Sequence, residues 1–136
     1  MVAYSFAACF EDKVSALIKC QTVRGDRRRH ARVGETVQLY TGMRTKQCRK
    51  LVDIDPLCIS VEPIAIYTAQ KCTEIVEAIY IDSQPLTRTG MYRFAEADGF
   101  PSDEMYSSRF HMGAFFVGKY GYGTFRGVLI KWAART

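Results

Sequence analysis

Hydrophobic and polar residues alternate along several short stretches of the chain, which is the pattern of β-strands with one buried face. The clearest case is residues 35–41, where Val37, Leu39 and Thr41 alternate with polar or half-polar neighbours. Pro63 lies inside another such stretch and favours an edge strand or a bulge there. Strands are predicted at residues 2–7, 21–24, 35–41, 48–54, 57–67, 73–81 and 125–132.

Three other segments have the spacing of helices. Apolar side chains recur at i, i+4, i+7 and i+8 from residue 10, which predicts a short helix ending near residue 19. A second helix is predicted with Thr89 as its N-cap and Gly99 just past its end. A third is predicted from Ser102, with acidic residues in its first turn.

The order of these elements bounds the fold. A strand and a helix are followed by several strands, two short helices and a last strand, without regular βαβ alternation. This order favours an α+β fold, built as a small, mainly antiparallel β-barrel with flanking short helices. A chain of 136 residues suits one domain, so residues 1–136 are predicted to form a single domain.

The composition narrows the class of protein. No apolar run approaches the roughly 20 residues that a membrane-spanning helix needs, and the N-terminus does not resemble a secretory signal. Five scattered cysteines lack the spacing of a zinc site, so we predict no metal and no cofactor. We expect a cytoplasmic protein whose thiols are reduced and mostly buried.

Positive charge is unevenly spread. The net charge is +5, while residues 24–32 alone carry a net charge of +4, and a second basic group lies at residues 44–50. Charge this local favours an anionic partner, with nucleic acid as the first candidate. The alternative at this point is that both segments are solvated loops.

Several segments together resemble a known family, the ASCH domain, a small barrel related to the PUA fold. The resemblance covers almost the whole chain and depends on the ordered set "FEDKVSALIK", "KCQTVRGDRRR", "GETVQLYTG", "FAEADGFPSDEM" and "FRGVLIKW". In the family motif G-x-K-x-x-E-x-R, Lys19 and Arg24 match, Leu17 replaces the glycine and Thr22 replaces the glutamate. The chain is similar overall to the short, phage-type ASCH proteins.

The threonine points to one branch of the family. Small ASCH amidohydrolases that deacetylate N(4)-acetylcytidine also carry threonine at this position, and their implicated catalytic residues are the lysine, the threonine and a distant glutamate. The resemblance therefore implies catalytic roles for Lys19, Thr22 and Asp98, with Glu96 as the alternative alignment. Leucine rarely adopts the positive φ that glycine allows, so Leu17 is expected to alter the turn that presents Lys19.

The chemistry of the motif sets further conditions. Thr22 can serve as a nucleophile if Lys19 acts as its base, which requires a lysine pKa lowered by burial or by neighbouring cations. Lys19 and Thr22 would point to opposite faces of one regular strand, so the chain must turn between them. The structural alternatives are a lysine at a helix C-terminus, an ordinary strand threonine and, for Arg24, a surface ion pair.

The sequence thus leaves several functions open. The first is binding of RNA, of a modified nucleoside or of another nucleotide-like ligand in a basic cleft around Lys19–Arg24. The alternatives are an N(4)-acetylcytidine-type amidohydrolase, a metal-independent ribonuclease, and a non-enzymatic protein-interaction factor. The residues predicted to bind substrate or nucleic acid are Arg24, Arg27, Arg28, Arg29 and Tyr40.

Overall fold

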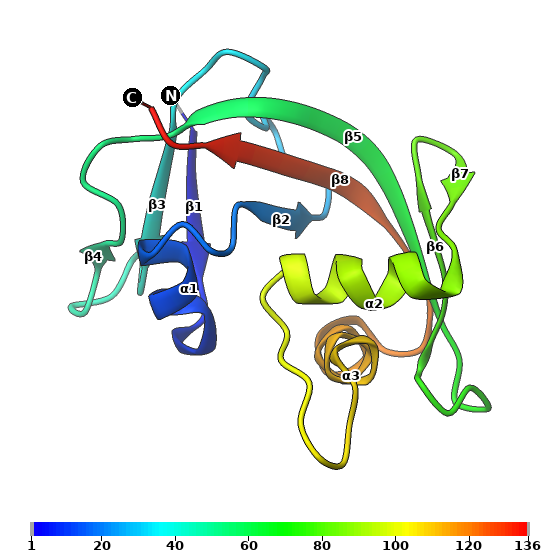
Figure 1. Ribbon diagram of the computed structural model, residues 1–136. Coiled ribbons are helices and arrows are strands. Elements are labelled where there is room, and N and C mark those ends of the chain that lie inside the picture. The colour runs from blue at the N-terminus through cyan, green and yellow to red at the C-terminus, as the bar shows by residue number, and fades with distance from the viewer. Residues whose placement is uncertain (1, 136) are drawn as a thin grey trace. The chain divides into compact units, whose positions relative to one another are not determined.

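Helices and short strands alternate irregularly through residues 2–135, the part of the chain that the computed structural model describes (Figure 1). The fold is α+β, as predicted. Within the described residues, the strands form a three-stranded and a five-stranded sheet, and no pairing closes either sheet into a barrel. The elements are β1 (Val2–Phe6), the 3-10 helix η1 (Ala8–Phe10), α1 (Glu11–Ser15), β2 (Gln21–Arg24), β3 (Val37–Thr41), β4 (Arg49–Lys50), β5 (Leu57–Thr68), β6 (Val76–Ile81), β7 (Gln84–Pro85), α2 (Arg88–Ala97), α3 (Ser108–Tyr120) and β8 (Gly123–Ala133).

The chain divides into two compact units. Unit 1 comprises the described residues up to Thr22, Arg27–Val61 and the described residues from Ile130 onward. Unit 2 comprises Val23–Asp26 and Glu62–Leu129. Strands β2, β5 and β8 each continue from one unit into the other along the chain. The single domain predicted for residues 1–136 stays a prediction.

Unit 1 is built on a parallel pair of strands. β1 runs beside β3 from Val2 opposite Val37 to Phe6 opposite Thr41, and the short β4 adds antiparallel to β3 (Figure 1). Both strands alternate buried and half-buried residues, which confirms the period-2 prediction for β3. Trp132 closes this core: it is 1% exposed and its ring meets Phe6 edge-on, with centroids 6.0 Å apart.

The predicted strand at residues 48–54 is wrong in length. Only Arg49 and Lys50 pair with β3, opposite Thr41 and Tyr40. Gly42 turns the chain with a φ of 63°, so Cys48 has no strand residue opposite it. At the other end of β4, Leu51 N–H makes one last bond to the Leu39 carbonyl at 2.8 Å before the chain bends away. The remaining residues of the predicted strand form bends and loops instead.

Unit 2 contains an antiparallel strand group and two helices. In the five-stranded sheet the strand order is β2-β8-β5-β6-β7. A two-residue turn joins β6 to β7, and its residues Asp82 and Ser83 have φ values of 50° and 65°, as the tightest hairpin turns require. Helices α2 and α3 lie side by side (Figure 1). Gly113 of α3 permits close packing, since an added Cβ would lie 2.6 Å from the Cβ of Ile75.

The helices exist where predicted, but their ends differ. The first ends at Ser15 and leaves Ile18 70% exposed, so the predicted apolar face is shorter. The second is capped by Thr87 rather than Thr89, because the Thr87 hydroxyl accepts from the Gly90 N–H. Gly99 does follow its end, with a φ of 102°.

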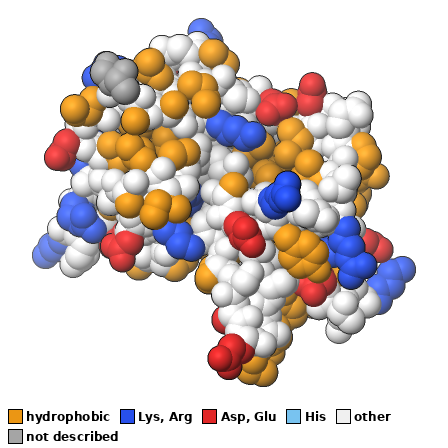
Figure 2. Space-filling view, viewed as in Figure 1, with side chains coloured by type: hydrophobic (Ala, Val, Ile, Leu, Met, Phe, Trp, Pro, Cys, Tyr) orange, Lys and Arg blue, Asp and Glu red, His pale blue; other side chains and the backbone are white. Residues whose placement is uncertain are grey.

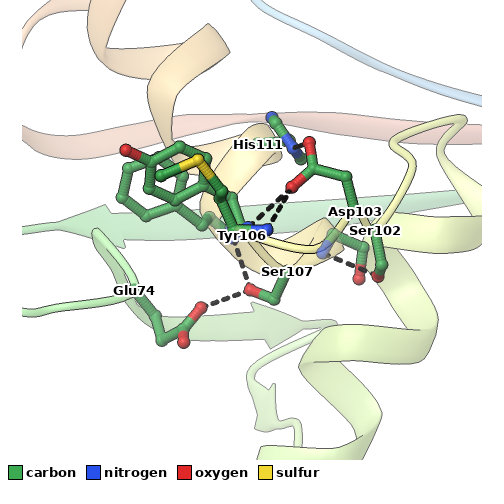
Figure 3. A network of polar contacts seen from close by, with 9 residues as sticks. Glu74, Ser102, Asp103, Tyr106, Ser107 and His111 are labelled. Carbon is green, nitrogen blue, oxygen red and sulfur yellow. Dashed lines mark hydrogen bonds and ion pairs between the residues drawn. The ribbon is translucent and has the colours of Figure 1, made fainter.

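The third helix begins later than predicted, and Figure 3 shows why. Ser107 is its N-cap: the hydroxyl accepts from Phe110 N–H and donates to Glu74. Ser102 instead accepts from Ser108 N–H across the preceding loop. A choice between two serines was therefore decided by Glu74, a residue 33 positions away.

Asp103 organises the same loop (Figure 3). Its carboxylate accepts from Met105 and Tyr106 N–H and lies 2.8 Å from His111 Nε2. These hydrogen bonds, that from Tyr106 first, hold the pKa of Asp103 below its ordinary value. His111 contacts Asp103 while the Ser107 hydroxyl binds Glu74, so the cluster caps a helix and is not arranged as a serine nucleophile with its base.

Candidate functional site

The segment around the predicted motif lysine is a helix-ending turn, here called the lysine turn (residues 16–22). Ile18 N–H bonds to the Lys13 carbonyl and Leu17 N–H to the Val14 carbonyl, with N···O distances of 2.9 and 3.0 Å. This pair of bonds is a Schellman motif, which ends a helix through a residue of left-handed conformation. Lys19 N–H bonds to the same Lys13 carbonyl at 3.0 Å, so the backbone at Lys19 is fixed by the helix end.

Leu17 occupies the left-handed position of this turn, with a φ of 57°. Leucine pays a steric cost for this conformation, which glycine would adopt without strain. The Cys20 thiol also donates to the Leu17 carbonyl, with Sγ 3.0 Å from the oxygen. Burial raises the pKa of this thiol, which disfavours a thiolate nucleophile at Cys20.

Lys19 is buried, with only 3% of its surface exposed. Its Nζ lies 4.9 Å from the ring centroid of Phe10 and 5.7 Å from that of Phe6, within the range of cation–π contacts. Lys19 lies before the first residue of β2, Gln21, and outside any regular strand. The observed turn lies at residues 16–18, before Lys19, so the convergence of the Lys19 and Thr22 side chains stays a prediction.

Thr22 is the second residue of β2 and is 4% exposed. Neighbouring Gln21 is buried as well, and the Cys20 carbonyl accepts from Trp132 N–H at 3.0 Å. Lys19 and Thr22 thus both belong to the interior of unit 1. Arg24, the last motif residue, is half-buried and belongs to unit 2.

The two acidic candidates differ sharply in exposure. Asp98 is the C-cap residue of α2 and is 4% exposed, whereas Glu96 is exposed. An anion at a helix C-terminus is disfavoured by the helix dipole, so a buried Asp98 is retained against an electrostatic cost. Burial therefore favours Asp98 over Glu96 as the acid of a site. Asp98 belongs to unit 2, and its convergence with Lys19 and Thr22 remains a prediction.

All four arginines of the arginine loop (residues 27–34) are exposed, but two of them are engaged within the protein. Arg27 donates through Nε to the Arg29 carbonyl and through both terminal nitrogens to the Ala3 carbonyl. Its guanidinium also lies 4.6 Å from the ring centroid of Tyr4. Arg29 forms an ion pair with Glu35, and this contact holds the pKa of Glu35 below its ordinary value.

Two residues of the second basic group, at residues 44–50, are likewise held in ion pairs. Arg49 pairs with Glu11 at 3.1 Å and Lys50 with Asp55 at 2.8 Å. In Figure 2, the part that belongs to unit 1 shows Lys and Arg side chains next to acidic ones. The formal charge of these segments therefore overstates the charge available to an anionic partner. The exposed basic residues of unit 1 outside these ion pairs and the Arg27 contacts are, among the described residues, Arg28, Arg32, Arg44, Lys46 and Arg135.

Tyr40 lies on the half-exposed face of β3, opposite Ser5 of β1 and Lys50 of β4. The structure brings it together with these neighbours and not with the arginine loop. In unit 2, Tyr120 packs against Phe125, with ring centroids 4.7 Å apart, and Phe116 meets Phe125 at 5.3 Å.

One feature of unit 2 was missed by the sequence reasoning. A pocket of about 330 Å³ is lined by side chains from β5, β6, β8 and the turn before β7, among them Ala65, Tyr67, Tyr80, Ser83, Arg126 and Gly127. A signal existed, because tyrosine occupies the exposed positions of two predicted strands. Nothing in the sequence, however, placed those strands beside Arg126.

Among residues 2–135, no group of three or more His, Cys, Asp or Glu side chains is placed to hold a metal ion, and no helix is long and apolar enough to cross a membrane. All five cysteines are free thiols. The expectation of mostly buried thiols is wrong, because Cys9 and Cys48 lie in surface connections and only Cys58 is buried.

Comparisons with protein-family models, with curated proteins and with solved structures found no match for this chain.

Proposed function

We propose that the protein binds a nucleoside or nucleotide-like ligand through the lysine turn, in the manner of an ASCH-type protein. The observation that carries the proposal is the burial of Lys19, which is 3% exposed at a turn fixed by helix-ending hydrogen bonds. A buried cation costs free energy that an apolar residue would not cost. A ligand-binding role gives a reason for keeping lysine at this position.

Because two arginines of the arginine loop are held by contacts within the protein, a compact ligand is favoured over a long RNA backbone. A phosphate backbone is bound by several exposed cations at once. Arg27 and Arg29 are committed to Ala3, Tyr4 and Glu35, which leaves fewer cations for such a surface. A small ligand at the lysine turn needs only one or two charged contacts.

The same proposal assigns the α+β fold to the ASCH type. It is supported by the left-handed φ of Leu17, at the position where the family motif has glycine. Leucine at this position gives no reason to expect a left-handed φ or the Schellman hydrogen bonds. The φ of Leu17 therefore supports the proposal separately from the residues that match the motif.

A second candidate, the N(4)-acetylcytidine amidohydrolase, is favoured by the burial of Thr22 and Asp98. In this reaction the Thr22 hydroxyl attacks the acetyl carbonyl carbon, and Lys19 Nζ takes the hydroxyl proton and returns it to the departing N4 amine. Water then hydrolyses the acetyl–Thr22 ester and releases acetate.

The test is a chromatographic assay for conversion of N(4)-acetylcytidine to cytidine, run beside equilibrium binding of both nucleosides. The amidohydrolase candidate expects turnover that Thr22→Val abolishes while binding persists. Binding without turnover supports the ligand-binding proposal alone. Neither binding nor turnover at millimolar nucleoside contradicts both.

A further inference from the structure

We propose that the pocket of unit 2 between Tyr67, Tyr80 and Arg126 binds one nucleotide unit, with its base against the tyrosine rings and its phosphate at Arg126. The pocket shares no residue with the lysine turn. The proposal therefore does not depend on the function proposed above.

The hollow follows from the strand register. Ala65 lies opposite Tyr80, and Tyr67 lies opposite Ala78, so each large ring on this face has a methyl group as its cross-strand partner. Cross-strand partners are about 5 Å apart, and a small partner leaves space beside the ring. The hollow is therefore built by regular strand pairing.

The tyrosine rings offer a stacking surface. Tyr67 and Tyr80 meet edge-to-face, with centroids 5.6 Å apart and ring planes at 74°. Tyr80 is 37% exposed, which is more than a residue that serves only as core would show. Ring contacts of this kind hold the rings in place, and a planar base can then stack on the exposed face.

Arg126 supplies the charge. It is exposed, and one terminal nitrogen donates to the Tyr67 hydroxyl at 3.3 Å, a long hydrogen bond. A guanidinium carries five N–H donors, so most of them remain for a ligand. An arginine binds a phosphate most strongly when two of these N–H groups donate parallel hydrogen bonds to it.

Size and neighbouring charge define the ligand further. A volume of about 330 Å³ lies near the lower end of the roughly 300–1,000 Å³ usual for small-molecule sites, which suits one nucleotide. An adjoining hollow is lined by Tyr67, Ala78, Tyr80 and the carboxylate-bearing Glu77. Since a carboxylate repels phosphate and accepts N–H donors, the phosphate belongs at the Arg126 end and the base edge toward Glu77.

The chemistry fits either a free nucleotide or one unit of single-stranded nucleic acid, and the experiment separates them. Isothermal titration would compare AMP, adenosine and an eight-nucleotide adenosine RNA on the wild type, Tyr80→Ala, Tyr80→Phe and Arg126→Gln. The matched controls are Tyr106→Ala and Arg93→Gln, exposed residues outside the pocket. Thermal unfolding of each variant would verify that it is folded.

The expected result is AMP binding that Tyr80→Ala and Arg126→Gln each weaken about tenfold or more, while Tyr80→Phe and both controls change it by about twofold or less. Adenosine should bind more weakly than AMP, and Arg126→Gln should not weaken it further. If the octamer binds more tightly than AMP, and the same variants weaken its binding, the ligand is single-stranded nucleic acid. If the octamer and AMP bind with equal affinity, the ligand is a free nucleotide.

Two results would overturn the proposal. One is no heat of binding for AMP or octamer at millimolar concentration. The other is binding that Tyr80→Ala and Arg126→Gln leave unchanged. Lys19→Met tests the two proposals separately, because it should abolish nucleoside binding at the lysine turn and leave AMP binding at Arg126 intact.

Discussion

The lysine turn and the arginine loop both place a cation on an aromatic ring of the same strand, and they differ in burial. Lys19 lies over Phe6 of β1 and is 3% exposed, whereas Arg27 lies over Tyr4 of β1 and is exposed. Arg27 is held by carbonyl groups of its own unit and fastens its loop. The exposed cluster that dominates the sequence is thus partly structural, and the buried Lys19 is the better functional candidate.

The largest expected effect is on function at Lys19. Lys19→Met keeps an unbranched side chain beside Phe6 and Phe10 and removes the charge. We expect nucleoside binding, or turnover where it occurs, to fall about a hundredfold or more. Arg28→Met removes an exposed charge as the control and should change either quantity by about twofold or less. Equal losses in the two variants would mean that net charge, rather than the buried site, governs binding.

The next effect concerns the left-handed residue of the lysine turn. Leu17→Gly should be more stable to unfolding than Leu17→Ala by about 1 kcal/mol, because only glycine adopts this φ without strain. At the neighbouring Ile18 the order should reverse, with alanine more stable than glycine. Urea denaturation of the four variants measures both differences. The same order at both positions would contradict the assigned turn.

A smaller effect is expected in the arginine loop. Arg27→Ala removes the contact with Tyr4 and the bonds to Ala3 and Arg29, and should lower the free energy of unfolding by about 0.5–1 kcal/mol. Arg28→Ala removes an exposed side chain and should change it by less than about 0.5 kcal/mol. If urea denaturation finds the two equal, Arg27 is not a fastening residue.

The smallest effect is a pH dependence at Glu35. Arg29 and the Arg32 N–H lower the pKa of Glu35 in the folded protein, so its contribution to stability is fully present above its unfolded pKa of about 4.3. That contribution disappears as the pH falls through the lower, folded pKa. Glu35→Gln should therefore lose less stability than the wild type between pH 5 and pH 3. Glu104→Gln, at an exposed residue, should follow the wild type.

Most strands of four or more residues could be predicted from sequence, and the shortest ones could not. β1 and β3 show the regular alternation of buried and half-buried residues, β5 and β8 were found near their predicted positions, and β2 has the predicted bounds. β4 and β7 have two residues each, which is too few for any period. Their existence depends on neighbouring strands rather than on their own residues.

The candidate site shows the same limit. The motif spacing identified Lys19, Thr22 and Arg24, but burial of Lys19 depends on Phe6 and Phe10, and no periodicity predicts that contact. Helix caps failed for a related reason, since Ser102 and Ser107 are equally suitable by residue type and Glu74 selects Ser107. The pocket at Arg126 joins β8 to the much earlier strands β5 and β6, so only the fold assembles it.

The discontinuity of unit 1 has a consequence for how this chain folds during synthesis. β1 pairs with β3 more than thirty residues later, and the core around Phe6 is completed only by Trp132. While the ribosome is still adding residues 62–129, the ring of Phe6 has no Trp132 to pack against. Such exposed apolar surface in nascent chains invites misassembly and chaperone binding. A stalled nascent chain should therefore resist protease at β1 only after residue 132 has emerged from the exit tunnel.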